Sequence, residues 1–214
     1  MTQRLVATEI SKKYGSFLAL APASFALNAG EITVLSGPNG SGKTTLLSCL
    51  AGLVRPSTGD VAVSDFDLYW DEVEVRRRMV FVPDVPRFYL ELTAWEHLRF
   101  IAMAHHVQQG FDQRAETLLR KLELWEARDL FPHHFSRGMR LKLGLALALI
   151  RPFEVLLLDE PTSALDIEGV GLLIDELRHS SEQGAAILLS THDPNLINQL
   201  GDRILKIQNG VIEA

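Results

Sequence analysis

The first third of the chain is built from short runs in which apolar and polar residues alternate. These runs cover residues 4–35 and are separated by the turn signals Tyr14-Gly15 and Asn28-Ala-Gly30. Alternation with a period of two, broken by glycine and asparagine, is typical of strands and hairpins. Further strands are expected at Asp60–Ser64 and Met79–Val82, because both runs are short and rich in valine.

The middle of the chain has the spacing of helices. Thr93-Ala-Trp-Glu96 has the form of a capping box and opens a helix expected over Trp95–His106. A second amphipathic run extends from Phe111 to Leu124. The sequence therefore predicts a helical subdomain, residues 84–135, inserted into a single domain whose α/β core comes from residues 1–83 and 136–214.

The last third returns to alternating helices and strands. Helices are expected over Arg137–Ile150 and Ile167–Arg178, and strands over Glu154–Leu158 and Ala185–Ser190. The first of these strands is apolar on both faces, which is typical of a central strand in a parallel sheet. A final hairpin is expected around Asn209-Gly210, a dipeptide that favours tight turns.

Candidate chemistry begins at Gly37–Thr45, which has the form G-x-x-x-x-G-K-[ST]. An apolar run, Glu31–Ser36, precedes it, and an expected helix, Leu46–Ala51, follows it. In this context the glycines let successive amide N–H groups turn toward one anion at the positive end of the helix dipole. Lys43 supplies a positive charge to the β- and γ-phosphates, and the Thr44 hydroxyl is a suitable ligand for Mg²⁺. The alternative, a flexible turn before an ordinary helix, is disfavoured because strand and helix both stand where the motif needs them.

Two acids, Asp159 and Glu160, follow the central strand, at the edge where α/β sheets bind ligands. Asp159 is expected to hold Mg²⁺ directly or through water, and Glu160 to orient or deprotonate an attacking water. His192, which ends the neighbouring strand, is a candidate for contacting the γ-phosphate or that water, although a single histidine there is often structural. Together with the loop, these residues predict an α/β fold of the P-loop NTPase class. It combines a RecA-like, mostly parallel sheet with an N-terminal antiparallel β subdomain and the helical insertion.

Composition limits the kinds of partner and the cellular compartment that we expect for this chain. Of the 214 residues, 47% are hydrophobic and 22% charged, so the chain is expected to be globular throughout. The net charge of −6 argues against a nucleic-acid partner. Cys49 is the single cysteine, which excludes an internal disulfide. The sequence shows neither a signal peptide nor an apolar run of about 18 residues, so we expect a cytoplasmic protein that reaches a membrane only through another chain.

In their order and spacing these motifs resemble the ATP-binding subunits of ABC transporters, and the resemblance covers essentially the whole chain. Phe135–Met139 is similar to that family's signature motif, L-S-G-G-Q, and Ser163–Asp166 is similar to its D-loop. The resemblance implies a dimer, with a second copy or a paralogous subunit, in which Ser136 and Gly138 contact the γ-phosphate of ATP held by the other protomer. It also implies that His192 is the switch histidine.

The resemblance further implies ATP and Mg²⁺ as ligands and an integral membrane permease as a partner, on the inner face of the cell membrane. Tyr14 matches the aromatic residue that stacks on adenine, with Phe17 as a second candidate. The catalytic residues would be Lys43, Glu160 and His192, and the metal would be held by Thr44, Asp159 and Asp84. The expected nucleotide-binding residues are Tyr14, Gly37, Pro38, Asn39, Gly40, Ser41, Gly42, Lys43, Thr44, Thr45, Ser136 and Gly138.

Two departures from the family pattern bear on activity. Asp84 stands where the family has the glutamine of its Q-loop; it can offer an oxygen to Mg²⁺ but cannot donate amide hydrogen bonds. Arg137 and Met139 replace a glycine and the glutamine of the signature. We therefore expect intact ATP binding and slower hydrolysis.

The sequence leaves three function classes to compare. The leading one is the ATPase subunit of a transporter, in which hydrolysis reopens the nucleotide sandwich and the helical subdomain carries the motion to the permease. Trp95 and Phe100 are candidates for the docking groove, or for core residues of that subdomain. The second class is a soluble ABC-type ATPase outside transport, which usually has coiled coils or two fused halves. The third, a P-loop kinase or GTPase, would leave Phe135–Met139 unexplained.

Overall fold

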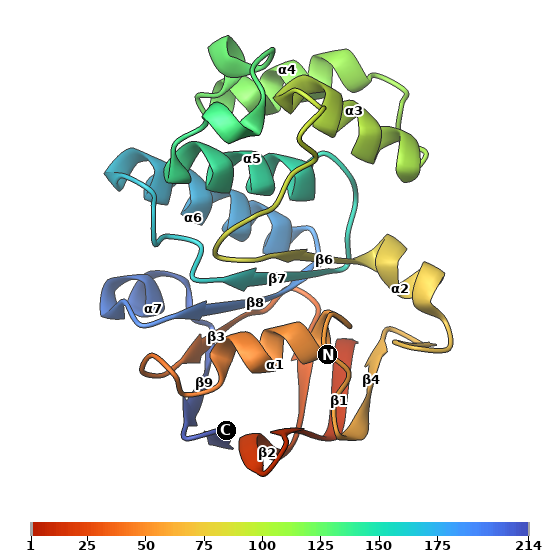
Figure 1. Ribbon diagram of the computed structural model, residues 1–214, viewed down its shortest axis with the longest axis vertical. Coiled ribbons are helices and arrows are strands. Elements are labelled where there is room, and N and C mark those ends of the chain that lie inside the picture. The colour runs from red at the N-terminus through yellow and green to blue at the C-terminus, as the bar shows by residue number, and fades with distance from the viewer. Residues whose placement is uncertain (1, 214) are drawn as a thin grey trace. The chain divides into compact units, whose positions relative to one another are not determined.

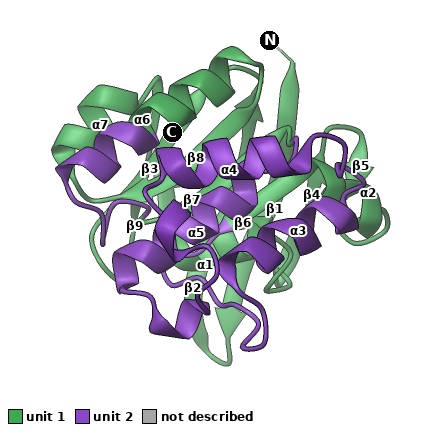
Figure 2. Ribbon diagram, turned by 90° about the horizontal axis from the view of Figure 1, so that it is seen from above, with its two compact units in different colours: residues 1–81, 153–160, 174–214 green, residues 82–152, 161–173 purple. Residues whose placement is uncertain are grey.

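The computed structural model describes residues 2–213 and divides the chain into two compact units. The first, here called the sheet unit, comprises residues 1–81, 153–160 and 174–214, and the second, the helical unit, comprises residues 82–152 and 161–173. Figure 2 shows the two units in different colours. Each unit has its own hydrophobic core, which is the basic requirement of a compact folding unit.

The order of elements along the chain follows the predicted alternation (Figure 1). In residues 2–213 the strands are β1 (Gln3–Tyr14), β2 (Phe17–Asn28), β3 (Ile32–Ser36), β4 (Thr58–Val63), β5 (Phe66–Asp67), β6 (Met79–Val82), β7 (Val155–Asp159), β8 (Ala186–Thr191), β9 (Arg203–Gln208) and β10 (Val211–Glu213). The α-helices are α1 (Lys43–Leu50), α2 (Glu72–Arg78), α3 (Ala94–Ala104), α4 (Phe111–Lys121), α5 (Arg137–Leu149), α6 (Ile167–Glu182) and α7 (Pro194–Leu200), and short 3₁₀ turns are η1 (Trp125–Ala127) and η2 (Pro132–His134).

The described strands form two sheets, one antiparallel and one largely parallel. The antiparallel sheet has the order β2-β1-β4-β5, and the larger sheet has the order β10-β9-β3-β8-β7-β6. In the larger sheet β8 lies between β3 and β7 and is parallel to both. Strands β3, β7 and β8 are apolar on both faces and almost completely buried, as expected for central parallel strands. The predicted fold class is confirmed.

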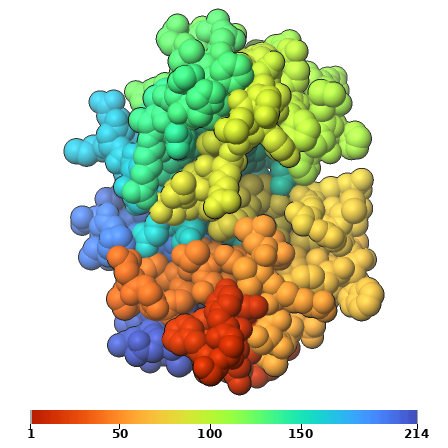
Figure 3. Space-filling view, viewed as in Figure 1, coloured from red at the N-terminus to blue at the C-terminus, as the bar shows by residue number. Residues whose placement is uncertain are grey.

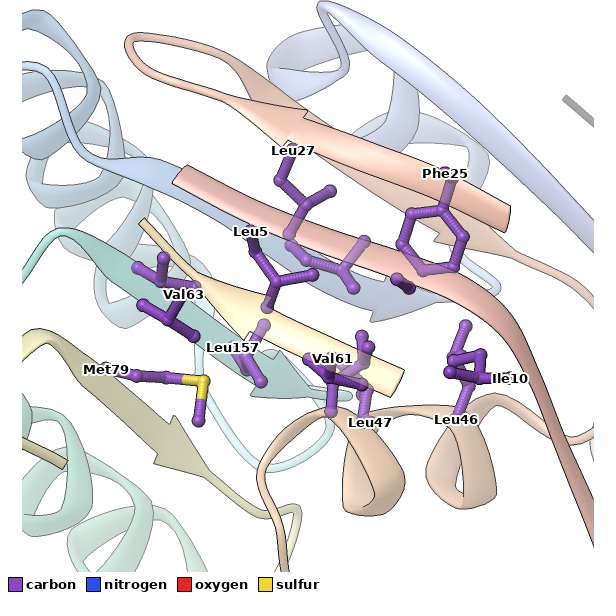
Figure 4. Packing of buried hydrophobic residues seen from close by; sticks show 14 of the residues in the cluster. Leu5, Ile10, Phe25, Leu27, Leu46, Leu47, Val61, Val63, Met79 and Leu157 are labelled. Atoms are coloured by element: carbon purple, nitrogen blue, oxygen red, sulfur yellow. The ribbon is translucent and has the colours of Figure 1, made fainter. Parts of the chain in front are cut away.

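The core of the sheet unit lies between the two sheets, around α1. Leu46, Leu47 and Leu50 of α1 are fully buried among side chains from both sheets. Figure 4 shows Leu46 and Leu47 beside Ile10 and Val61 of the antiparallel sheet. Because α1 directly follows the glycine-rich loop, burial of these leucines fixes the position of the loop relative to the strand ends.

The core of the helical unit is formed by α3, α4 and α5. Leu143 and Ala146 of α5 are buried in one cluster with Leu98 of α3 and Leu119 of α4. The predicted capping box is present: Thr93 accepts a hydrogen bond from the Glu96 backbone, and the Glu96 side chain accepts one from Thr93.

The boundary between the units differs from the predicted one. The sequence places residues 136–150 in the α/β core, whereas the structure assigns α5 to the helical unit, together with residues 161–173. The physical reason is the apolar face of α5, which packs on α3 and α4. Helical spacing reveals such a face, but it does not tell which neighbour will cover it.

Two further features differ from the sequence prediction. The short alternating runs at the N-terminus belong to two continuous strands, β1 and β2, whose register shifts at several irregularities. Helix α7 was not predicted, although Asp193 accepts a hydrogen bond from the Asn195 backbone as its N-cap and Pro194 occupies the first turn. Over residues 2–213, each helix falls short of the length and apolar character needed to span a bilayer.

His97 of α3 holds the segment that precedes the helix. The side chain is 3% exposed; its Nδ1–H donates to the Thr93 carbonyl at 2.7 Å, and Nε2 accepts from the Tyr89 backbone N–H at 3.0 Å. These partners require the neutral ring, because a protonated Nε2 cannot accept. Burial lowers the pKa of His97, while the hydrogen bond to Thr93 and the charge of Glu96 oppose this effect.

We expect the helical unit to lose stability as the pH falls through the acidic range. The folded state lowers the pKa of His97, so its contribution is complete above the unfolded pKa of about 6.5 and is lost as the pH falls toward the folded value. Thermal unfolding followed by circular dichroism between about pH 7 and pH 5 measures this loss. His97→Gln should flatten the profile, whereas His179→Gln, a change at an exposed histidine, should leave it unchanged. Equal slopes in all three proteins would contradict the assignment.

Candidate functional site

The candidate site of the sheet unit lies at the carboxyl ends of β3, β7 and β8. The glycine-rich loop follows β3, Asp159 ends β7, and His192 follows β8. Because β8 pairs with both other strands, these three ends are adjacent. The carboxyl edge of a parallel sheet is the usual position of a ligand site in α/β proteins.

Close packing explains two glycines of the loop, Gly37 and Gly42. A Cβ atom at Gly37 would lie 2.2 Å from the Ile207 carbonyl oxygen, and Gly42 has φ +109° with the Ala19 carbonyl oxygen 2.9 Å from the position of a Cβ. Pro38, Asn39, Gly40 and Thr44 are exposed, whereas Ser41 is buried. The Ser41 hydroxyl is a buried polar atom without a hydrogen-bond partner among the described residues. An anion seated in the loop would supply an acceptor for it, so the loop fits a phosphate group.

Lys43 is the first residue of α1, and its ammonium group lies beside the start of the loop. Its side chain is 6% exposed, and its ammonium donates to the carbonyl oxygens of Gly37 at 2.8 Å and Pro38 at 3.3 Å. Glu160 Oε1 lies 3.2 Å from Nζ as an ion pair, but without the alignment of a hydrogen bond. The charge of Lys43 is thus compensated within the sheet unit.

Glu160 contacts both Lys43 and His192. Its backbone has φ +45°, in the left-handed region that non-glycine residues seldom adopt. Its Oε2 lies 3.1 Å from Nδ1 of His192, whose side chain is largely exposed. Lys43, Glu160 and His192 therefore form one contact chain beside the loop, as expected of groups that act on one phosphate and one water.

Ser190 of β8 joins both acids, and the sequence analysis did not single it out. Its hydroxyl donates to Asp159 Oδ1 at 2.6 Å and accepts from the Glu160 backbone N–H at 2.9 Å. Ser190 is fully buried and pairs directly with Asp159 in the sheet register. The one available signal was a hydroxyl residue at the end of an otherwise apolar run.

The residues suited to Mg²⁺ supply few protein ligands. Thr44 offers an exposed hydroxyl and Asp159 a buried carboxylate at the end of β7. Within residues 2–213, no cluster of three or more histidine, cysteine, aspartate or glutamate side chains has the arrangement of a metal cage. Mg²⁺ is commonly bound by one or two protein oxygens together with substrate phosphates, so this sparse set fits that ion.

Tyr14 lies at the tip of the β1–β2 hairpin, where its ring is half-exposed. Phe17 pairs with it across the turn and is also exposed. The Lys12 ammonium lies 5.0 Å from the centre of the Tyr14 ring, so one ring face carries a cation–π contact. Both candidates for adenine stacking are therefore accessible.

In the helical unit, the signature-like segment forms the start of α5. Ser136 is the N-cap of this helix and accepts a hydrogen bond from the Met139 backbone at 3.2 Å. Gly138 lies against the D-loop segment, because a Cβ there would be 2.6 Å from the Ala164 carbonyl oxygen. A capped helix start with a small residue beside it is suited to an approaching anion.

The two departures from the family pattern are in contact with each other. Arg137 Nη2 donates to both carboxylate oxygens of Asp84, at 2.7 and 3.0 Å, and to the Ser163 hydroxyl at 3.1 Å. The Ser163 hydroxyl in turn donates to Asp84 Oδ1 at 2.5 Å. The negative charge of Asp84 is thus offset by the arginine that replaces a glycine of the signature. Its predicted part in holding Mg²⁺ remains a prediction.

Comparisons with known proteins agree with this geometry. The sequence model of the family "ABC transporter" matches residues 20–163. The chain is 32% identical to the SkfA peptide export ATP-binding protein SkfE of Bacillus subtilis, over 97% of this chain and 87% of that protein. It is also 32% identical to a probable amino-acid ABC transporter ATP-binding protein of Haemophilus influenzae, over 97% and 85% of the two chains.

Solved structures give the same result. An ATP-binding subunit of an ABC transporter superposes with a TM-score of 0.93 at 31% identity, covering 99% of this chain and 88% of that one. A dimeric bacterial ABC transporter cassette superposes with a TM-score of 0.89 at 26% identity, covering 98% and 97%. The chain therefore belongs to the ABC transporter family, as one of its ATP-binding subunits. Members of this kind bind ATP and are ATPases.

Proposed function

We propose that this chain hydrolyses ATP at the interface of a nucleotide-sandwich dimer and thereby drives transport through a separate membrane permease. The observation that carries the proposal is the contact chain from Lys43 through Glu160 to His192 beside the phosphate loop. A positive charge for the phosphates and a carboxylate that can accept a proton from water are the groups that phosphoryl transfer to water requires.

Each candidate site residue of the sheet unit has a distinct part in this reaction. The loop amides and Lys43 bind the β- and γ-phosphates, and Glu160 takes the proton of the attacking water. His192 holds Glu160 in place through its Nδ1 contact, at 3.1 Å. Thr44 and Asp159 would hold Mg²⁺, which would supply positive charge to the phosphates. Tyr14 stacks on the adenine.

The second half of each site would come from another protomer, either a second copy or a paralogous subunit. Ser136 caps α5 and is exposed at the start of the helix, while Gly138 lets the Ala164 backbone pack closely beside the first turn, so the start of α5 would approach the γ-phosphate through Ser136. The dimeric form of a solved relative supports this arrangement. Closure then depends on the γ-phosphate, and hydrolysis reopens the dimer.

An exposed apolar patch on the helical unit is the proposed permease contact. Tyr89 is 58% exposed, Phe100 46% and Met103 55%. The ring centroids of Tyr89 and Phe100 lie 5.6 Å apart, in edge-to-face contact. Figure 3 shows the yellow segment that joins β6 to α3 at the surface. Trp95 instead packs on Phe111 in edge-to-face contact, as a core residue does. The patch would attach the subunit to the cytoplasmic side of the membrane protein.

Purification of the wild-type protein with the product of a neighbouring membrane-protein gene tests the proposal. We expect a complex of two ATPase subunits with the permease, with Mg²⁺-dependent phosphate release. For the subunit without the permease, phosphate release should rise steeply with subunit concentration, because two copies must meet. Failure to associate, with hydrolysis that is independent of concentration, would favour a soluble ATPase outside transport. Absence of hydrolysis would contradict the proposal itself.

Asp84 and Arg137 should act on turnover as a pair. Asp84→Gln alone leaves the guanidinium without its carboxylate, and Arg137→Ala alone leaves the carboxylate uncompensated, so each should lower turnover and the double variant should recover it. An exposed ion pair contributes at most about 1 kcal/mol to stability, so thermal unfolding should move little. Steady-state hydrolysis by the four proteins measures the coupling.

The exposed pair Glu72–Arg76 of α2 is the matched control for this cycle. Glu72→Gln, Arg76→Ala and the double variant should all keep the wild-type turnover. Additive losses at Asp84 and Arg137 would show that the two departures act independently.

A further inference from the structure

A single buried hydroxyl organises both acids of the site. Ser190 Oγ donates its only proton to Asp159 Oδ1 and uses a lone pair to accept the Glu160 backbone N–H. The direction of the first bond is fixed, because an ionised carboxylate only accepts. Since one hydroxyl serves two consecutive residues, its position determines both at once.

The strand order explains why Ser190 has this position. β8 runs between the strand that precedes the loop and the strand that ends in Asp159. Ser190 pairs with Leu35 on β3 on one side and with Asp159 on β7 on the other. It is 0% exposed, so water does not compete for its hydrogen bonds.

Glu160 needs such support more than an ordinary residue does. Its φ of +45° is an unfavourable conformation for a residue with a side chain, and it persists only where the surroundings hold it. The bond from its N–H to Ser190 is a direct restraint on this backbone. The turn directs the carboxylate toward both Lys43 and His192.

Asp159 is restrained in a complementary way. Its Oδ1 is engaged by Ser190, which orients the carboxylate and directs the other oxygen away from that bond. Partners of this kind fix the orientation of metal-binding carboxylates in proteins, and their removal commonly costs metal affinity or activity.

We propose that Ser190 is a positioning residue for ATP hydrolysis: it holds the Glu160 carboxylate at the place of the attacking water and presents one oxygen of Asp159 to Mg²⁺. Ser190 does not touch the reacting atoms and acts only through these two acids. The inference rests on the proposed ATP hydrolysis. Measurements of ATP binding distinguish failure of the positioning role of Ser190 from failure of the proposed hydrolysis.

The test compares Ser190→Ala with Ser190→Thr, which keeps the hydroxyl, in the full chain. We expect Ser190→Ala to lower kcat by roughly 10- to 100-fold with little change in the KM for ATP, and to raise the Mg²⁺ concentration that gives half the maximal rate. Ser190→Thr should recover most of the rate. Equilibrium titration of a fluorescent ATP analogue with and without Mg²⁺ should show metal-assisted binding weakened in Ser190→Ala, while metal-free binding is unchanged.

Ser11→Ala is the matched control. Ser11 is a buried serine of β1 whose hydroxyl bonds to Thr58 at 2.7 Å, in the antiparallel sheet. The Ser11→Ala protein should show a shift in thermal unfolding comparable to that of Ser190→Ala, but keep the wild-type kinetics and Mg²⁺ dependence. A wild-type kcat and Mg²⁺ requirement in Ser190→Ala would overturn the proposal, and so would a loss confined to stability. A wild-type protein that binds ATP without hydrolysing it would overturn the proposed function, whereas the metal dependence of binding would still test Ser190.

Discussion

Replacement of Glu160 by glutamine is expected to leave ATP bound between two copies of the chain and to suppress its hydrolysis. The amide has the size of the carboxylate but cannot accept a proton from water, and loss of a general base typically costs about 10²- to 10⁴-fold in rate. The substitution also removes a negative charge 3.2 Å from the Lys43 ammonium. Binding of the anionic triphosphate should therefore become tighter.

Light scattering on a sizing column measures the dimer, and phosphate release measures the rate. Glu154→Gln is the control: Glu154 stands directly before β7, where it pairs with Arg4 and Arg78, far along the strand from Asp159. That variant should lose some stability and keep its turnover. A Glu160→Gln protein that stays monomeric with ATP would contradict the sandwich, and unchanged turnover would exclude Glu160 as the base.

Lys43→Ala is expected to abolish ATP binding at ordinary concentrations. Truncation of one partner of a buried charge pair between binding partners costs about 2–5 kcal/mol of binding free energy, which corresponds to a Kd roughly 30- to 5,000-fold higher. Here the cost has two sources: the phosphates lose their cation, and Glu160 remains beside them without its counter-charge. Titration calorimetry measures the affinity.

The double variant Lys43→Ala/Glu160→Gln separates these two sources. If the carboxylate repels the phosphates, the double variant should bind ATP more tightly than Lys43→Ala, though more weakly than the wild type. Retained affinity in Lys43→Ala would overturn the assignment of the loop. Equal affinities in the single and double variants would show that only the lost cation matters.

The parts of the site that the sequence predicts are those encoded by short motifs next to a strand. The loop, Asp159, Glu160 and His192 all stand within a few residues of an apolar run, so their position at one sheet edge follows from parallel pairing. Ser190 stood in the same kind of run, but its role depends on β8 lying between β3 and β7. Strand order is a property of the folded sheet that a linear pattern does not contain.

The contacts of Asp84 show the same limit at the surface. Its partners Arg137 and Ser163 are 53 and 79 residues away, and both departures from the family pattern look unfavourable when each is considered alone. Only the folded helical unit brings them together as an ion pair. The predicted boundary and the boundary between the two compact units differ at α5 for a related reason, because an apolar helix face does not specify which neighbour it will contact.

In the proposed function, the Glu160 carboxylate, which pairs with Lys43, competes with the terminal phosphate of ATP for the same ammonium. Arrival of the nucleotide is then an exchange of anions at a charge that is already neutralised, which limits the cost of stripping water from the lysine. In the proposed reaction, departure of inorganic phosphate returns the ammonium to Glu160. In this proposal, the group that takes the place of the released phosphate on Lys43 belongs to the same chain as the lysine.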